Sequence, residues 1–261
     1  MKNISIGNVS YSYRPEEKAL SSINLTIPKG SFCGIIGPNG SGKTTLLKCI
    51  SGYLIPQSGK VLISGKNVAD FSTRQIAKTM ALVQQHFALE YDFTVMEIVL
   101  TGRNPHLKRM QSESSKDYEI ANESMKRAEV YHLKDRMVTT LSGGEWQRMI
   151  LARALCQQAS IMLLDEPVTG LDIKHQVSFL ESAKRLAIEE KISVVCVLHD
   201  LNLAENYCDN IALLKKGQLY KKGIPSEVLT KDNLEHVYET KINIFEKNGE
   251  KYIFPAYKKE K

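Results

Sequence analysis

A membrane-spanning helix needs an apolar run of about eighteen residues, and the sequence lacks one. Its longest apolar stretches, such as Ile192 to Leu198, have the length of buried strands. Met1 to Ser10 also lack the basic segment, apolar run and cleavage site of a signal peptide. The five cysteines show no C-x-x-C spacing, which argues against a zinc site and a disulfide framework. These absences predict a cytosolic chain with reduced core cysteines.

Charge is spread thinly along the sequence. The net charge of the 261 residues is +6, and the densest basic stretch is Lys258 to Lys261. No concentrated basic arm is present, so we expect no nucleic-acid partner. A solvated surface near an anionic membrane leaflet explains the positive net charge as well as a nucleic-acid partner would. The length and the 43% hydrophobic content fit one large α/β domain.

Strand and helix patterns alternate along most of the chain. The alternation after residue 144 predicts a mostly parallel sheet covered on both faces, preceded by an N-terminal antiparallel β-layer. We expect one domain over residues 1–240 with a helical subdomain inserted at about 94–144, and a small hairpin with a basic tail at 241–261, turning at Asn248-Gly249. The expected strands are 4–9, 23–27, 32–36, 161–164, 192–198, 211–214 and 218–222, and the expected helices are 43–51, 145–157, 174–189, 201–207 and one from 225.

A phosphate-binding loop stands between the expected strand at 32–36 and the expected helix at 43–51. The sequence there fits G-x-x-x-x-G-K-[ST], and the flanking elements are the context that the motif requires. Its glycines let backbone N–H groups face the phosphates, Lys43 is expected to reach the β- and γ-phosphates, and the Thr44 hydroxyl is expected to ligate Mg²⁺. The expected ATP-binding residues are Gly37, Pro38, Asn39, Gly40, Ser41, Gly42, Lys43, Thr44 and Thr45.

Two further strands end in polar side chains. Asp165 and Glu166 follow the apolar strand at 161–164, and at that edge of a parallel sheet Asp165 can hold the Mg²⁺ shell while Glu166 polarises a water. His199 follows the strand at 192–198. Alone it would be read as a helix cap or surface residue, but after a phosphate loop it is a candidate for contacting the γ-phosphate.

A second anion-binding helix start follows at Ser142, Gly143, Gly144 and Glu145. One nucleotide needs only one phosphate loop. The second anion-binding helix start is therefore expected to bind the nucleotide of a partner chain.

Together these motifs resemble the ABC transporter ATPase family over nearly the whole chain. The resemblance implies that Ser142 to Glu145 form the signature acting in trans, and that Asp165 and Glu166 are the Walker B pair with the catalytic glutamate. It also implies an ATPase that uses Mg²⁺. The resemblance further implies that Asp172 belongs to the D-loop and that His199 is the switch histidine. It implies that the Tyr13 ring stacks on adenine, and that Gln85 is the Q-loop residue, which senses magnesium, water and the permease.

The sequence departs from the family pattern at several positions. Gln84 stands where a proline often precedes the Q-loop glutamine, so Gln84 remains a rival to Gln85. Tyr11 lies two residues from Tyr13 and leaves the adenine-stacking role open between them. Glu145 replaces the glutamine often found in the signature, and Gly170 makes the approach to the D-loop looser.

Two segments resemble importers of ferric siderophores, haem and cobalamin: Thr94 to His106 and Gly223 to Thr230. Ferric siderophore uptake is the first expectation because it is the commonest task of that group, although a helix-ending turn would also explain residues 102–105. The resemblance implies a head-to-tail homodimer on the cytoplasmic side of the cell membrane, a polytopic permease as partner, and a substrate-binding protein as indirect partner.

Two other classes of function compete with transport. A non-transport ABC ATPase would act in DNA repair, translation or cluster assembly, and the first two of these tasks would be expected to show a second cassette, a long coiled coil or a basic arm. A small-molecule P-loop kinase would need a pocket for the phosphoryl acceptor in place of the helix start at Ser142 to Gly144.

Overall fold

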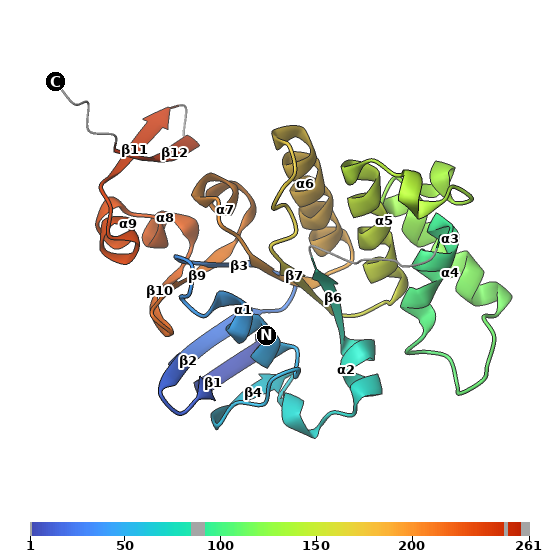
Figure 1. Cartoon of the computed structure of the whole chain (residues 1–261), viewed down its shortest axis with the longest axis horizontal. Coiled ribbons are helices and arrows are strands. Elements are labelled where there is room, and N and C mark those ends of the chain that lie inside the picture. Colours follow the sequence, from blue (N-terminus) through green and yellow to red (C-terminus); the bar gives the residue numbers. More distant parts are fainter. Residues whose placement is uncertain (1, 85–91, 248–249, 257–261) are drawn as a thin grey trace. The chain divides into compact units, whose positions relative to one another are not determined.

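The computed structural model describes residues 2–84, 92–247 and 250–256 (Figure 1). The chain divides into two compact units, the first made of Met1–Asp70 with Val195–Lys261 and the second of Phe71–Val194. The expected helical insertion at 94–144 thus lies inside the second unit. In the described part of the chain, no helix is both long and apolar enough to cross a membrane.

The first unit begins with the expected antiparallel layer, whose strand order is β2-β1-β4-β5 (Figure 1). Alternating apolar residues of β1 pair with those of β2, for example Ile4 with Ile27 and Val9 with Ile23, and all four are fully buried. This is the period-two pattern of a sheet with one buried face. The strands are β1 (Lys2–Arg14), β2 (Glu17–Pro28), β4 (Ser58–Ile63) and β5 (Lys66–Asn67), followed by the 3-10 helix η1 (Val68–Asp70).

A second set of strands in the first unit carries the phosphate loop. β3 is buried at all five positions and runs parallel to β9, which turns back antiparallel into β10. The burial on both faces explains why β3 reads as a continuous apolar run. The elements are β3 (Phe32–Ile36), α1 (Lys43–Ile50), α7 (Leu201–Tyr207), β9 (Asn210–Lys215) and β10 (Gln218–Gly223).

The C-terminal part of the first unit is a helix pair and a hairpin. α8 (Pro225–Val228) starts at the expected proline and α9 (Lys231–Tyr238) follows it. β11 (Ile242–Lys247) and β12 (Glu250–Pro255) then pair antiparallel (Figure 1). The expected turn at Asn248-Gly249 lies outside the described residues.

The second unit combines a parallel strand pair with helices. β6 and β7 run parallel, and α4 and α3 each contact α5 (Figure 1). β8 (Ser193–Val197) carries the chain back into the first unit. The other elements are α2 (Thr73–Thr79), β6 (Met80–Gln84), α3 (Val95–Leu100), η2 (Thr101–Arg103), α4 (Ser115–Arg127), η3 (Tyr131–Leu133), η4 (Val138–Thr140), α5 (Gly143–Cys156), β7 (Ile161–Asp165) and α6 (Ile173–Glu189).

The five cysteines are buried thiols, as the sequence predicts. Burial raises the pKa of Cys33 and of Cys156 to about 12 and the pKa of Cys49 to about 11. A thiol with so high a pKa holds its proton near neutral pH and is a poor nucleophile. These cysteines therefore pack as small apolar residues.

Candidate functional site

The phosphate loop starts at Gly37, directly after β3, and leads into α1. Gly37, Gly40 and Gly42 have φ angles of 148°, 75° and 98°, which side chains rarely allow. A Cβ at Gly37 would lie 2.3 Å from the Leu214 carbonyl oxygen, and one at Gly42 would lie 2.7 Å from the Ala19 oxygen. α1 begins without a side-chain cap hydrogen bond, so its first N–H groups suit an anionic ligand.

Lys43 spans the phosphate loop from within. Its Nζ donates hydrogen bonds to the carbonyl oxygens of Gly37 at 2.9 Å and Pro38 at 3.1 Å, and the residue is only 5% exposed. A buried ammonium group needs such partners, and these two carbonyls keep it beside the backbone N–H groups of the loop. The loop glycines, the uncapped start of α1 and this lysine fit the phosphates of a nucleotide.

Tyr13 reaches the start of α1 from β1. Its hydroxyl lies 3.3 Å from Thr45 Oγ1, and half of its surface is exposed. Tyr11 packs edge-on against Tyr13, with ring centroids 5.1 Å apart. Of the two tyrosines that the sequence leaves open, Tyr13 is the one whose hydroxyl lies beside Thr45, an expected ATP-binding residue.

His199 lies near the same end of β3 as the phosphate loop. The N–H of Leu198 donates to the Ile35 carbonyl oxygen at 3.1 Å, and β3 ends one residue later. His199 is exposed and follows Leu198 directly. The first unit thus places the expected switch histidine, the phosphate loop and Tyr13 around one strand end.

A hollow of about 210 Å³ adjoins the loop residues 38–41. The basic turn Lys215-Lys216 and the end of α9, Val237 to Glu239, line its remaining walls. The Tyr238 hydroxyl oxygen is buried and makes no standard hydrogen bond within the described residues. Burial raises the pKa of Tyr238 to about 12, and the nearby Gly37 backbone opposes this rise. The sequence carries no local signal for this contact between α9 and the loop.

Gly217 connects the phosphate loop to the N-terminal β-layer. Its N–H donates to the Ser41 carbonyl oxygen at 3.1 Å, and its own carbonyl accepts from the Ser21 N–H at 2.8 Å. A Cβ at this position would lie 2.8 Å from the Ala19 oxygen. Gly217 is therefore a structural support of the loop that motif searching does not detect.

In the second unit, Asp165 ends β7 and pairs in register with Gln84 of the parallel strand β6. Glu166 follows with a φ of 51°, a left-handed conformation that is costly for a residue with a side chain. Ten residues other than glycine have a positive φ among the described residues, so this backbone conformation does not by itself distinguish Glu166. Gln85 lies outside the described residues, directly after the strand end that Asp165 meets.

The signature residues form a closed capping box at the start of α5. Glu145 N–H donates to Ser142 Oγ, while the Ser142 N–H and hydroxyl donate to Glu145 Oε2 at 2.8 and 2.9 Å. The hydrogen bonds from the Ser142 N–H and then from its hydroxyl lower the pKa of Glu145. Ser142 and Gly143 are exposed. Glutamate thus replaces glutamine here without loss of the capping interaction.

Side-chain amides join the signature helix to the segments around it. Gln147 Nε2 donates to the Pro167 carbonyl oxygen at 2.5 Å, next to Glu166. Gln176 Nε2, in α6, donates to the Val168 carbonyl oxygen at 3.3 Å and to the Leu171 carbonyl oxygen at 3.0 Å, which joins α6 to the segment that follows Glu166. The second unit therefore groups the signature, the Glu166 segment and the D-loop.

The expected Mg²⁺ ligands are the Thr44 hydroxyl, the Asp165 carboxylate and the Gln85 amide. Within the described residues, no group of three or more His, Cys, Asp or Glu side chains could hold a metal ion. Mg²⁺ commonly binds one or two protein carboxylates together with substrate phosphates and water.

The ABC transporter family model matches residues 20–169. The hemin import ATP-binding protein HmuV of Gloeobacter violaceus is 44% identical over 223 residues, which cover 83% of this chain and 80% of that protein. The ferric enterobactin transport ATP-binding protein FepC of Escherichia coli is 38% identical over 217 residues, again 83% of this chain and 80% of that protein. The cobalamin import ATP-binding protein BtuD of Halobacterium salinarum is 37% identical over 227 residues, 87% of this chain.

Among solved structures, the dimeric structure of MJ0796, a bacterial ABC transporter cassette, is similar with a TM-score of 0.72 at 32% identity. The match covers 85% of this chain and 98% of that chain. The chain therefore belongs to the ABC transporter family. The match to the cobalamin relative covers only 56% of that protein's length.

Proposed function

We propose that this chain is the ATP-hydrolysing subunit of an importer, and that it acts as a head-to-tail homodimer with a separate membrane permease. One observation carries the proposal: the chain has a phosphate loop before α1 and a second helix start that opens with two glycines, at α5. Only the first has the glycine-rich loop and buried lysine of a complete phosphate site. The second, exposed at Ser142 and Gly143, suits the nucleotide held by another copy.

In the first unit, the loop N–H groups and Lys43 bind and orient the phosphates, and the Tyr13 ring supports the adenine. His199 contacts the γ-phosphate and helps to hold it in place. When bound, Mg²⁺ neutralises charge on the phosphate oxygens, and Thr44, Asp165 and Gln85 would hold it. The burial of Lys43 and the half-exposed Tyr13 ring support these assignments.

In the second unit, Glu166 accepts a proton from the attacking water, and Asp172 belongs to the segment that meets the opposite chain. The position of Glu166 directly after Asp165, at the end of β7, supports its role. The exposed capping group of Ser142 supports its role as a ligand in trans: once the hydroxyl leaves Glu145 it can donate to a phosphate oxygen.

We propose an iron-containing cargo, a ferric siderophore first and haem second, with cobalamin as a further alternative. Relatives named for hemin and ferric enterobactin transport, at 44% and 38% identity over four fifths of their lengths, support iron. The proposed partners are a second copy of this chain, a polytopic permease and, through it, a substrate-binding protein. The proposed location is the cytoplasmic face of the cell membrane, as a peripheral subunit.

Mixed dimers test the head-to-tail arrangement. With Lys43→Ala on one chain and Ser142→Arg on the other, one composite site carries both lesions and the second site is intact. With both lesions on one chain opposite a wild-type chain, each site carries one lesion. We expect nucleotide trapping in the first arrangement and little in the second, measured in covalently linked or differently tagged heterodimers. Equal trapping in both would contradict the role of Ser142 in trans.

A further inference from the structure

The imidazole of His175 is held by the residue that caps its own helix. Asp172 is the N-cap of α6, and its Oδ1 accepts a hydrogen bond from the His175 N–H at 2.9 Å. The same oxygen lies 2.8 Å from His175 Nδ1. One carboxylate oxygen therefore fixes both the start of α6 and the orientation of the ring.

The other edge of the ring lies against the signature. A Cβ at Gly144 would lie 2.2 Å from His175 Cδ2 and 2.7 Å from His175 Nε2, so the ring occupies the space that any side chain at position 144 would need. A Cβ at Gly143 would lie 3.5 Å from Leu171 Cδ2, an ordinary contact. A side chain at position 144 would therefore have to displace the His175 ring within this chain.

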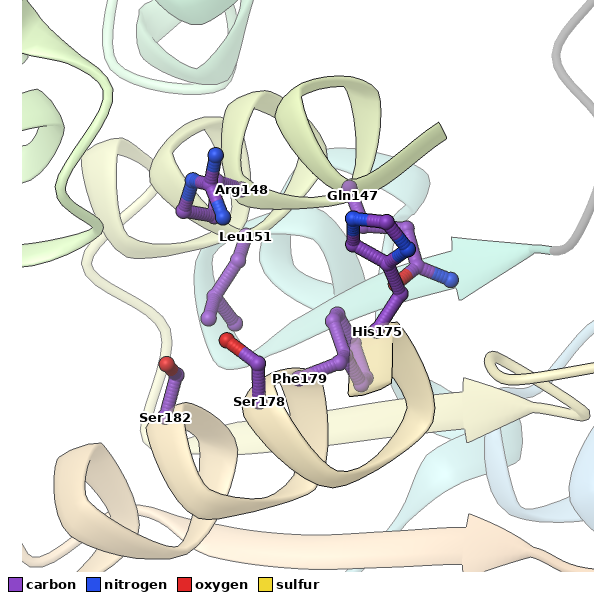
Figure 2. A pocket seen from close by; sticks show the side chains of 8 residues that line it. Gln147, Arg148, Leu151, His175, Ser178, Phe179 and Ser182 are labelled. Atoms are coloured by element: carbon purple, nitrogen blue, oxygen red, sulfur yellow. The ribbon is translucent and has the colours of Figure 1, made fainter. Parts of the chain in front are cut away.

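Behind the ring, α5 and α6 leave a small gap in their packing. A hollow of about 10 Å³ lies between the two helices, and His175 and Phe179 project into this space from α6 (Figure 2). Gln147 Oε1 and Arg148 Nε are buried there without hydrogen-bond partners among the described residues. The hollow has room for roughly one water molecule.

We propose that His175 is a positioning residue that couples the D-loop carboxylate of Asp172 to the signature backbone at Gly144. The inference rests on the proposed function, in which Ser142 and Asp172 both face the partner chain. A displacement of Asp172 carries the imidazole with it, and the ring cannot advance without moving the Gly144 backbone. Ser142 caps the same turn of α5. The position of its hydroxyl, the proposed donor to the partner's nucleotide, therefore depends on the position of the D-loop.

Two substitutions separate the two contacts of the ring. His175→Phe keeps an aromatic ring over Gly144 but loses the nitrogen that meets Asp172. His175→Asn keeps a polar group for Asp172 but is too short to cover Gly144. Ser178→Ala is the matched control, because Ser178 lies one turn further along α6 and lines the same hollow.

We expect kcat for ATP hydrolysis to fall at least about 5-fold in both His175 variants, with KM for ATP within about 2-fold of wild type. The reason is that the phosphate loop lies in the other unit and keeps its own contacts. Ser178→Ala should match the wild-type kcat. Unchanged kcat in both His175 variants of an active protein would overturn the coupling and leave the proposed function standing.

A double-substitution cycle tests the contact without an activity assay. Gly144→Ala should lower the thermal unfolding midpoint of the full-length chain, because its methyl group displaces the ring. In a His175→Ala background, Gly144→Ala should lower the thermal unfolding midpoint by clearly less, so the effects of the two substitutions are not additive. Additive effects would overturn the contact. A wild-type chain that hydrolyses no ATP would overturn the proposed function and the coupling together.

Discussion

Arg103 and Asp117 form a buried ion pair in the second unit, with Nε 2.9 Å from Oδ1 and at most a tenth of either side chain exposed. Arg103 also donates to the Cys156 carbonyl and to Gln158 Oε1, each at 2.9 Å. The pair therefore fastens α4 to the end of α5. Hydrogen bonds from the Ser114 hydroxyl and N–H, and then from Arg103, lower the pKa of Asp117 to about 2.

Asp117→Asn should make stability less sensitive to acid. Because the folded-state pKa lies below the ordinary value of 3.8, ionised Asp117 stabilises the fold fully above about pH 5, and this stabilisation is lost as the pH falls through 4 toward 2. A shift of roughly two pKa units corresponds to about 2.7 kcal/mol. Urea unfolding at pH 7, 5 and 3 measures the free energy of unfolding.

The control for this experiment is Glu123→Gln on the same helix. Glu123 pairs with Lys126 at 2.8 Å on the exposed face of α4, where an ion pair contributes little to stability. The control should follow the wild-type pH dependence. If the free energy of unfolding depends on pH in the same way in the wild-type protein and in Asp117→Asn, the buried ion pair is not the cause of the acid sensitivity.

Glu166→Gln should bind Mg-ATP and form a stable nucleotide-dependent dimer, while its hydrolysis rate falls by about 100-fold or more. The amide keeps the shape of the side chain but accepts a proton poorly. Phosphate release measures turnover, and size-exclusion chromatography with ATP measures the dimer. Glu181→Gln, at an exposed carboxylate of α6, is the control and should behave as wild type. Hydrolysis near the wild-type rate would remove Glu166 from the catalytic role.

Tyr238 should support the phosphate loop through its ring. Tyr238→Phe removes a buried hydroxyl that lies beside the Gly37 backbone, so stability should fall by about 1 kcal/mol or less and ATP affinity should stay close to wild type. Tyr238→Ala should destabilise the fold by about 2 kcal/mol or more and weaken ATP binding, because it leaves an unfilled space beside residues 38–41. Fluorescent-nucleotide titration distinguishes the variants. If Tyr238→Phe binds ATP as weakly as Tyr238→Ala, the hydroxyl and not the ring is the important group.

We propose that the permease contacts the surface around Gln85 and residues 94–103, and Glu97 offers a test of this contact. Thr94 N–H and hydroxyl donate to Glu97 Oε2 at 2.7 and 2.8 Å, closing a capping box at the start of α3. Glu97→Lys opens this box and places a positive charge at a helix N-terminus, so transport should fall more than ATP affinity. Glu97→Gln keeps the cap and is the control.

Substrate uptake and ATP binding are measured for both Glu97 variants, together with co-purification of the permease. Normal uptake by Glu97→Lys with an intact permease complex would place the docking surface elsewhere on the chain. Loss of uptake in both variants would show that the charge of Glu97, and not the helix cap, matters.

Local sequence patterns predicted the elements whose periodicity is strong. The strand at 32–36 and the helix at 201–207 occur as expected, and α6 differs by one residue at its start. α2 and β6 were not predicted, because residues 73–84 run on without a turn signal between them. The change from helix to strand at Met80 is set by pairing with Ile161 of β7, a partner far along the chain. Local propensity does not contain that information.

The motif residues of the candidate site were found from sequence, but their supports were not. Glu145 was read as a departure from the family, although Ser-x-x-Glu before a helix is a capping-box signal that would have explained it. No such signal exists for Tyr238 beside the phosphate loop or for His175 over Gly144. These contacts join segments separated in the chain, and only the folded backbone brings them together.

The turn between β9 and β10 has consequences for protein engineering. Gly217 uses its N–H for Ser41 and its carbonyl for Ser21, and its α-carbon faces Ala19 too closely to carry a side chain. An insertion here would shift one of these bonds and release the phosphate loop from the β-layer. Tags, reporter domains and the new ends of a circularly permuted chain therefore belong elsewhere, even though a short surface hairpin is usually the first place to put them.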